Sequence, residues 1–169
     1  MEIILVLDNI RSCYNVGAIL RTAEGFGISR VILSGYTPRV HDQKLLPHLR
    51  EKLDKEIHKT ALGAEDMLDI YSCDDIKQAL KKLHQKGWQI IGLENNIKDV
   101  PICALNAVDL KKKITDKVVL VLGEEVHGID YSLYDIINLF IEIPMRGQKE
   151  SFNVSVAAGI AMYGLSTLY

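Results

Sequence analysis

The sequence lacks the features that mark secreted, metal-binding and membrane proteins. Its three cysteines are odd in number, widely spaced and never form a C-x-x-C pair: Cys13, Cys73 and Cys103. This pattern argues against a disulfide framework or a zinc site and favours a reducing, cytoplasmic location. The five histidines are scattered without ligand spacing, so we expect no metal. No apolar run approaches the roughly 20 residues of a membrane span, and the first residues lack a signal-peptide pattern.

Glycine-rich phosphate loops are missing as well. Neither G-x-G-x-x-G nor a P-loop occurs, so an ordinary dinucleotide or nucleoside-triphosphate site is not supported. The chain also contains no linker, repeat or low-complexity segment. With 169 residues, of which 48% are hydrophobic and 25% charged, it is long enough to bury a core. We therefore expect one domain over residues 1–169 with no appended RNA-binding domain.

The net charge of −2 does not suggest a nucleic-acid-binding protein, but the charge is unevenly distributed. Residues 11–59 contain nine Lys/Arg and five Asp/Glu, a net charge of +4, and the remainder carries −6. A basic first third is compatible with a phosphate-bearing partner. On charge alone, however, chance variation and solvated surfaces explain the difference better.

Apolar runs alternate with helical patterns along the chain. Buried strands are predicted in EIILVLDNI, SRVILSGYTP, WQIIGLE, KVVLVLGEE and NLFIEIP, and helices in NVGAILRTAEGFGI, CDDIKQALKKLHQKG and NVSVAAGIAMYGLSTLY. Residues 41–69 are mixed and loop-rich. The alternation predicts an α/β domain with a mainly parallel sheet. Ligands of such sheets bind beyond the carboxyl ends of the strands, which directs attention to the segments after Leu93, Leu122 and Ile143.

Three groups of residues are candidates for a site. In the first, Asn15 is placed as a helix N-cap, and Arg21 is expected to lean back over Gly17 toward the helix start, where an anion would bind. An exposed arginine paired with Glu24 is an equally good interpretation. In the second, Glu125 lies in GEEVHG, a turn after a buried strand. Its carboxylate could orient a hydroxyl or an arginine, although a solvated turn explains these six residues better.

The third group surrounds a polar loop between an apolar strand and an uncharged helix. Ser151 and Asn153 stand where that helix begins, so one of them is expected to be the N-cap. A helix without charge, from Asn153 to Tyr169, must be buried all round, either inside the monomer or in a subunit interface. A core helix with a flexible entry loop is the simpler alternative.

Together, these stretches resemble the SpoU (TrmH-like) branch of the SPOUT RNA methyltransferases. The resemblance is carried by LDNIRSCYNVGAILRTAEGFGI, VLVLGEEVHGI and IPMRGQKESFNVSVAAGIAMY, with support from HKTALGAE, and it spans nearly the whole chain. It implies a C-terminal trefoil knot, a homodimer through the final helix, and binding of S-adenosylmethionine (AdoMet). The implied cofactor-binding residues are Leu93, Glu94, Leu122, Gly123, Ile143, Met145 and Phe152.

The resemblance also implies methyl transfer to a ribose 2′-hydroxyl of RNA, with tRNA favoured over rRNA. A guanidinium normally stays protonated, so we assign Arg21 to the adjacent phosphate and the developing alkoxide rather than to proton abstraction. Asn15 and Glu125 would orient this group, and Ser151 and Asn153 would hold the loop and the ribose. The alternative is a non-enzymatic RNA-binding protein that retains the knotted fold.

Overall fold

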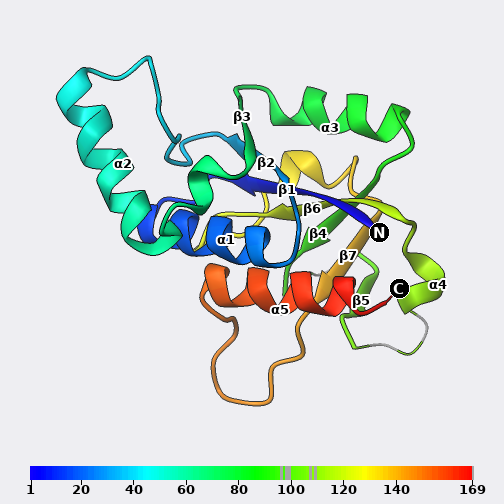
Figure 1. The fold of residues 1–169 in the computed structure, drawn as a ribbon. Coiled ribbons are helices and arrows are strands. Elements are labelled where there is room, and N and C mark those ends of the chain that lie inside the picture. The colour runs from blue at the N-terminus through cyan, green and yellow to red at the C-terminus, as the bar shows by residue number, and fades with distance from the viewer. Residues whose placement is uncertain (96, 98–99, 107, 109, 169) are drawn as a thin grey trace.

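The computed structural model describes residues 1–95, 97, 100–106, 108 and 110–168. Its centre is a seven-stranded sheet in the order β3-β2-β1-β6-β4-β7-β5, in which every pair is parallel (Figure 1). The strands are β1 (Glu2–Asp8), β2 (Arg30–Ser34), β3 (Asp69–Cys73), β4 (Gln89–Leu93), β5 (Ile102–Ala104), β6 (Lys117–Leu122) and β7 (Leu139–Glu142). The predicted parallel α/β fold is confirmed, whereas the trefoil knot stays a prediction.

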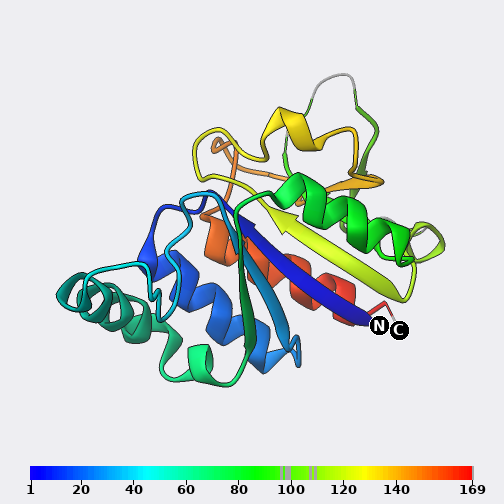
Figure 2. The ribbon, with the colours of Figure 1, turned by 90° about the horizontal axis from the view of Figure 1, so that it is seen from above.

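Helices cover both faces of the sheet. They are α1 (Cys13–Gly25), α2 (Pro47–Ala61), α3 (Ile76–Gln85), α4 (Leu110–Lys113) and α5 (Val154–Ser166), with short 3-10 helices η1 (Ala64–Asp66) and η2 (Tyr131–Leu133). Helices α1 and α5 lie on one face, and α3 and η2 lie on the other (Figure 2). Because both faces are covered, the central strands β1 and β6 are apolar almost throughout. No helix among the described residues is long and apolar enough to span a membrane.

The prediction of a loop-rich segment at residues 41–69 was wrong. This segment contains the fifteen-residue helix α2, which projects from the body beside the start of α1 (Figure 1). The last residue of the segment, Asp69, is the first residue of β3. Helix α2 buries only Ile57 and Ala61, so its apolar stripe is too narrow to stand out in the sequence. Gly17 of α1 allows the close contact, because a Cβ there would collide with Thr60 and the Ile57 carbonyl.

The helix ends agree with the predictions in part. Asn153 caps α5, since its Oδ1 accepts a hydrogen bond from the Ser155 amide at 2.9 Å. The predicted N-cap at Asn15 is wrong: the N-cap is Ser12, three residues earlier, and its hydroxyl accepts a hydrogen bond from the Asn15 amide. This frees the Asn15 side chain for other contacts. Tyr169, the last residue of the predicted final helix, lies outside the described residues.

Candidate active site

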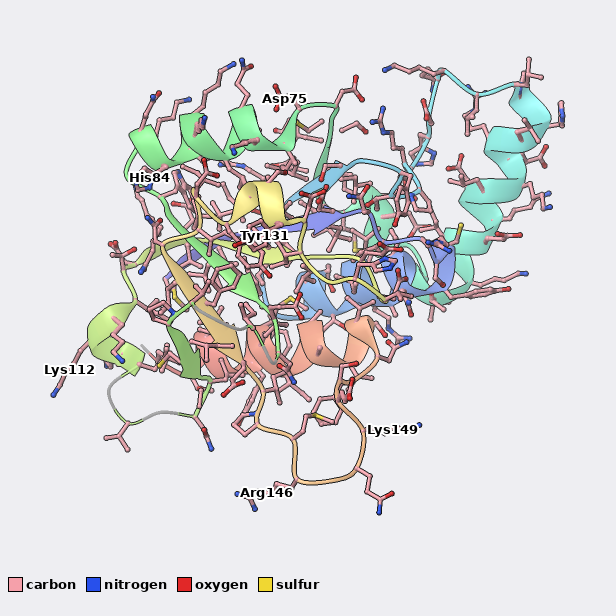
Figure 3. All side chains as sticks on the ribbon, turned by 180° about the vertical axis from the view of Figure 1, so that it is seen from behind. Asp75, His84, Lys112, Tyr131, Arg146 and Lys149 are labelled. Carbon is pink, nitrogen blue, oxygen red and sulfur yellow. The ribbon has the colours of Figure 1, made fainter. Side chains whose placement is uncertain are left out.

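A cavity of about 550 Å³ lies beyond the carboxyl ends of β6, β4 and β7. This is the edge of the sheet where the sequence predicted a ligand. Eight of the predicted site residues line it: Leu93, Glu94, Leu122, Gly123, Glu125, Ile143, Ser151 and Phe152. Met145 is not among the lining residues, because the chain after Ile143 leaves the body as an open loop that carries Arg146 and Lys149 (Figure 3).

Side chains that follow β4 fix the walls of the cavity. The Asn95 side chain donates to the Ile143 carbonyl and accepts from the Ile143 amide, both at 3.2 Å. One Glu94 oxygen accepts from the Ile129 amide at 2.9 Å. These contacts join the loops after β4, β6 and β7 into one frame. Asn95 was missed by the sequence analysis, although its place just after a predicted strand was a usable signal.

The turn after β6 depends on two glycines. Residues Glu124 and Gly128 form an antiparallel bridge, with backbone hydrogen bonds of 3.0 and 2.9 Å. A Cβ on Gly123 would overlap the Gly128 and Ile129 backbone, and Gly128 adopts φ +73° against the Glu94 carboxylate. The turn therefore folds back tightly over the end of its own strand, and this places its backbone along the cavity.

The Glu125 carboxylate binds the start of α1. It accepts hydrogen bonds from the backbone amides of Arg11 (3.2 Å) and Ser12 (3.4 Å), and from the Asn15 side-chain nitrogen (3.0 Å). Partial desolvation raises the pKa of this carboxyl, but these hydrogen bonds outweigh it, so the net pKa is lowered. Glu125 thus stays ionised near neutral pH, and it orients the helix start rather than an arginine side chain.

Asn15 extends this network to the last helix. Its Oδ1 accepts a hydrogen bond from the Asn153 side-chain nitrogen at 3.2 Å, while its own nitrogen donates to Glu125. The Asn153 oxygen is held by the amide and hydroxyl of Ser155, at 2.9 and 2.6 Å. Three predicted catalytic residues from distant motifs are therefore joined by direct hydrogen bonds, and a fourth, Ser151, lines the cavity beside them.

Arg21 is the exception among the predicted catalytic residues. Its side chain is exposed on α1, and within the described part of the chain it neither lines the cavity nor has a hydrogen-bond or ion-pair partner. The expected approach to the helix start does not occur, because α1 begins at Cys13 and Arg21 is more than two turns away. The alternative pairing with Glu24 is not seen either. Its assignment to RNA phosphate stays a prediction.

The cavity lining contains several carboxylates and two tyrosines. Its carboxylates are Glu94, Glu124, Glu125 and Glu150, and no Lys or Arg lines it among the described residues. The sequence analysis missed Tyr131 and Tyr134, which lie on and just after η2 and line the cavity (Figure 3 labels Tyr131). Their rings pack against each other with centroids 4.7 Å apart and a tilt of 34°. Such a site suits a ligand that carries positive charge and a flat ring.

The family assignment comes from the chain as a whole. The family model described as "SpoU rRNA Methylase family" matches residues 2–163. The chain belongs to this family. The cavity, the Glu125–Asn15–Asn153 network and the projecting loop all fall within the matched residues.

Curated relatives of this SpoU-family chain are RNA methyltransferases by name. The chain is 32% identical over 161 residues to a 23S rRNA (guanosine-2′-O-)-methyltransferase of Xylella fastidiosa, covering 95% of this chain and 57% of that protein. It is 28% identical over 165 residues to a putative TrmH family tRNA/rRNA methyltransferase of Staphylococcus aureus, with 96% and 58% covered. The chain thus spans a little over half the length of these relatives.

Solved structures confirm the fold. A putative RNA methyltransferase of the TrmH family from Porphyromonas gingivalis is 26% identical and superposes with a TM-score of 0.77, covering 96% of this chain and 58% of that one. An AdoMet-bound rRNA methyltransferase from Sinorhizobium meliloti gives 0.76 at 22% identity, with 96% and 55% covered. Both proteins share the arrangement of sheet and helices described above.

Proposed function

We propose that this chain transfers a methyl group from AdoMet to a ribose 2′-hydroxyl of RNA. The observation that carries the proposal is the cavity with four carboxylates, an aromatic wall and, in its described lining, no Lys or Arg. AdoMet carries a sulfonium and an ammonium, which an acidic cavity attracts, and an adenine ring, which tyrosines stack. The same carboxylates would repel a phosphate-bearing cofactor such as a nucleotide. Family membership supports the same activity.

When bound, AdoMet supplies an electrophilic methyl carbon. The methyl group would pass to the ribose oxygen, with sulfur keeping the electron pair of the C–S bond and solvent taking the hydroxyl proton. The chain's residues bind and orient the reactants. The side-chain amides of Asn15 and Asn153 are hydrogen-bonded to each other, and Glu125, which lines the cavity, fixes the Asn15 rotamer. A fixed hydroxyl geometry is the main source of rate when the leaving group needs little activation.

We further propose a homodimer that brings Arg21 to the site of a second copy. Apolar side chains are exposed along α5 and the end of α1: Phe26 (38%), Phe152 (40%), Val156 (49%) and Tyr163 (62%). Arg21 is exposed on α1, the helix that packs against α5. A second copy packed there would cover the apolar side chains and supply the cation that the cavity lacks.

Mixing two inactive variants tests this arrangement. Arg21→Ala and Asn153→Ala should each lose methyl transfer, and a refolded mixture should recover about a quarter of wild-type activity if each mixed dimer holds one intact site. A monomeric mass in sedimentation, or no recovery in a mixture shown to contain mixed dimers, contradicts the shared site.

The predicted preference for tRNA over rRNA gains no support from the relatives' names, one of which specifies 23S rRNA. The test therefore incubates the protein with labelled AdoMet and separate tRNA and rRNA fractions, followed by digestion and identification of the labelled nucleoside. We expect a 2′-O-methylated nucleoside, at a rate strongly reduced in Asn153→Asp. Calorimetric binding of RNA without binding of AdoMet would instead favour the non-enzymatic RNA-binding protein.

A further inference from the structure

Two cation–tyrosine pairs involve residues at the α1 N-terminus. The Arg11 guanidinium carbon is 5.8 Å from the centroid of the Tyr36 ring, and Lys59 Nζ is 5.7 Å from the centroid of the Tyr14 ring. The two tyrosines are exposed to similar extents, 51% for Tyr36 and 49% for Tyr14. We call these four residues the tyrosine platforms.

The Arg11–Tyr36 platform is held in place from three loops. Arg11 forms an ion pair with Glu124 at 2.7 Å, and Glu124 in turn contacts His127 Nδ1 at 2.9 Å. The Tyr36 amide donates to the Asn9 side chain at 3.3 Å, so the two loops that carry the pair are joined directly. Fixing the side chains in advance lowers the entropy that a ligand must overcome to order them.

The second platform is fixed by α2. The Thr60 hydroxyl donates to the Tyr14 carbonyl at 2.9 Å, and Lys59 Nζ lies 3.4 Å from the Tyr14 hydroxyl. The projecting helix therefore places a cation over an exposed ring at the first turn of α1. Exposed cation–π pairs and surface ion pairs add little to stability, so the fold itself does not require either platform.

The sheet order places the platforms beside the proposed reaction centre. Strands β2, β1 and β6 are neighbours, and the loops after them carry Tyr36, Arg11 and Glu124 in that order. The Arg11 amide donates to Glu125, and Tyr14 directly precedes Asn15, so each platform is bonded to the network. The cavity lies on the other side of that network, over β6, β4 and β7.

We propose that the tyrosine platforms bind two unpaired nucleobases of the RNA substrate next to the acceptor nucleotide. The inference rests on the proposed function and specifies its substrate as a single-stranded or looped RNA segment. Exposed aromatic rings and guanidinium planes stack unpaired bases, and the Lys59 ammonium attracts the phosphates between them. In a duplex the bases are already stacked on each other, so the platforms would have nothing to bind. The +4 segment at residues 11–59, to which all four residues belong, fits this role.

The test measures binding of a fluorescein-labelled oligouridine of about ten nucleotides and of a blunt RNA duplex of about the same length, by anisotropy at low salt. The variants are Tyr36→Leu and Tyr14→Leu. Tyr71→Leu is the matched control, because Tyr71 is 53% exposed but lies within edge strand β3, away from the site. Thermal melting verifies folding, and calorimetry measures AdoMet affinity for each variant.

We expect the single strand to bind more tightly than the duplex, and each platform variant to lose about 5- to 150-fold in single-strand affinity, the range for one stacked base. AdoMet affinity and the Tyr71→Leu control should stay unchanged. Single-strand affinity that survives both platform variants, or tighter binding of the duplex, overturns the inference. Loss of AdoMet affinity without loss of RNA affinity also overturns it, because the platforms would then only tie the loops together.

The two proposals fail separately in these measurements. If the protein transfers no methyl group but binds the single strand in a way that depends on Tyr36 and Tyr14, the enzymatic proposal is wrong and the tyrosine platforms stand as an RNA-binding surface. If the protein transfers methyl groups and the KM for RNA is the same in Tyr36→Leu, Tyr14→Leu and Tyr71→Leu, the platform proposal is wrong and the enzymatic proposal stands.

Discussion

The substitution Gly123→Ala tests how the cavity is built. A Cβ at this position would come closer than 3.0 Å to the backbone of Gly128 and Ile129, an approach that real Cβ atoms essentially never show. Backbone atoms cannot rotate away as a side chain can, so residues 124–128 would have to move. The Glu124–Gly128 bridge and the hydrogen bond from the Ile129 amide to Glu94 oppose that movement.

The cost follows from these contacts. Overpacking a tight site costs about 1–3 kcal/mol, and one lost hydrogen bond adds about 1 kcal/mol. We expect Gly123→Ala to lower the free energy of unfolding by about 2–4 kcal/mol in urea denaturation. The displaced turn lines the cavity, so AdoMet affinity measured by calorimetry should also fall. Each 1.4 kcal/mol of the destabilisation that persists in the AdoMet complex lowers the affinity about tenfold.

Gly25→Ala is the matched control. Gly25 is the last residue of α1, and a Cβ there meets nothing within 4 Å. Its replacement should leave AdoMet affinity unchanged and raise stability by up to about 1 kcal/mol through reduced flexibility of the unfolded chain. Equal stability and equal AdoMet affinity of the two variants would refute the close packing of the turn as the basis of the cavity.

Three further predictions concern polar side chains. Asn153→Asp keeps the oxygen that caps α5 but loses the donor to Asn15, so it should melt like the wild type and lose methyl transfer. Asn153→Ala should lose methyl transfer and also about 1 kcal/mol of stability. An active Asp variant would show that the hydrogen bond from the Asn153 amide to Asn15 has no part in the mechanism. Because the pKa of Glu125 is lowered in the folded state, its carboxylate contributes its full stabilisation above pH 4.5, the ordinary pKa of a glutamate. The difference in urea midpoint between wild type and Glu125→Gln should therefore shrink as the pH falls below 4.5. A difference that stays constant with pH would contradict this. The hydrogen bond to Asp66 raises the pKa of His41 above 6.5; partial desolvation opposes this shift, and Asp54 adds to it. The stability that protonated His41 contributes is therefore fully present below pH 6.5 and is lost as the pH rises through the pKa of the folded state. Solvent screens this exposed group, and His41→Asn, which tolerates the φ of +54°, should therefore cost about 0.2–1 kcal/mol near pH 6 and less near pH 9.

The sequence was informative where one physical signal dominated. Continuous apolar runs identified β1 and β6, because both faces of a central parallel strand are buried. The strong amphipathic pattern identified α3. By contrast, α2 buries two residues and β3 is a half-exposed edge strand, so neither gives a clear period. Strand β5 has only three residues, too few for any pattern.

The candidate site shows the same division. Position just after a buried strand predicted most of the cavity lining, because carboxyl ends of parallel strands share one edge. The network could not be predicted from residue type, since Glu125 and Asn15 meet only because β6 is the neighbour of β1. The pattern that placed Asn15 at the N-cap also misplaced Arg21, because the true cap at Ser12 shifts the helix start by almost one turn.

The distribution of charge explains how a chain with net charge −2 is compatible with both proposed ligands. A cationic methyl donor and a polyanionic RNA require potentials of opposite sign, and mixing acid and base at one place would weaken both. Here the acids line the cavity, whereas Arg11 and Lys59 lie across the network from it. Glu124 and Glu125 form the boundary: the first neutralises and orients Arg11, and the second binds the amides at the start of α1. Each carboxylate thus contacts a donor on the side of the proposed RNA surface and also lines the acidic cavity. Two surfaces of opposite charge therefore meet at one hydrogen-bonded turn.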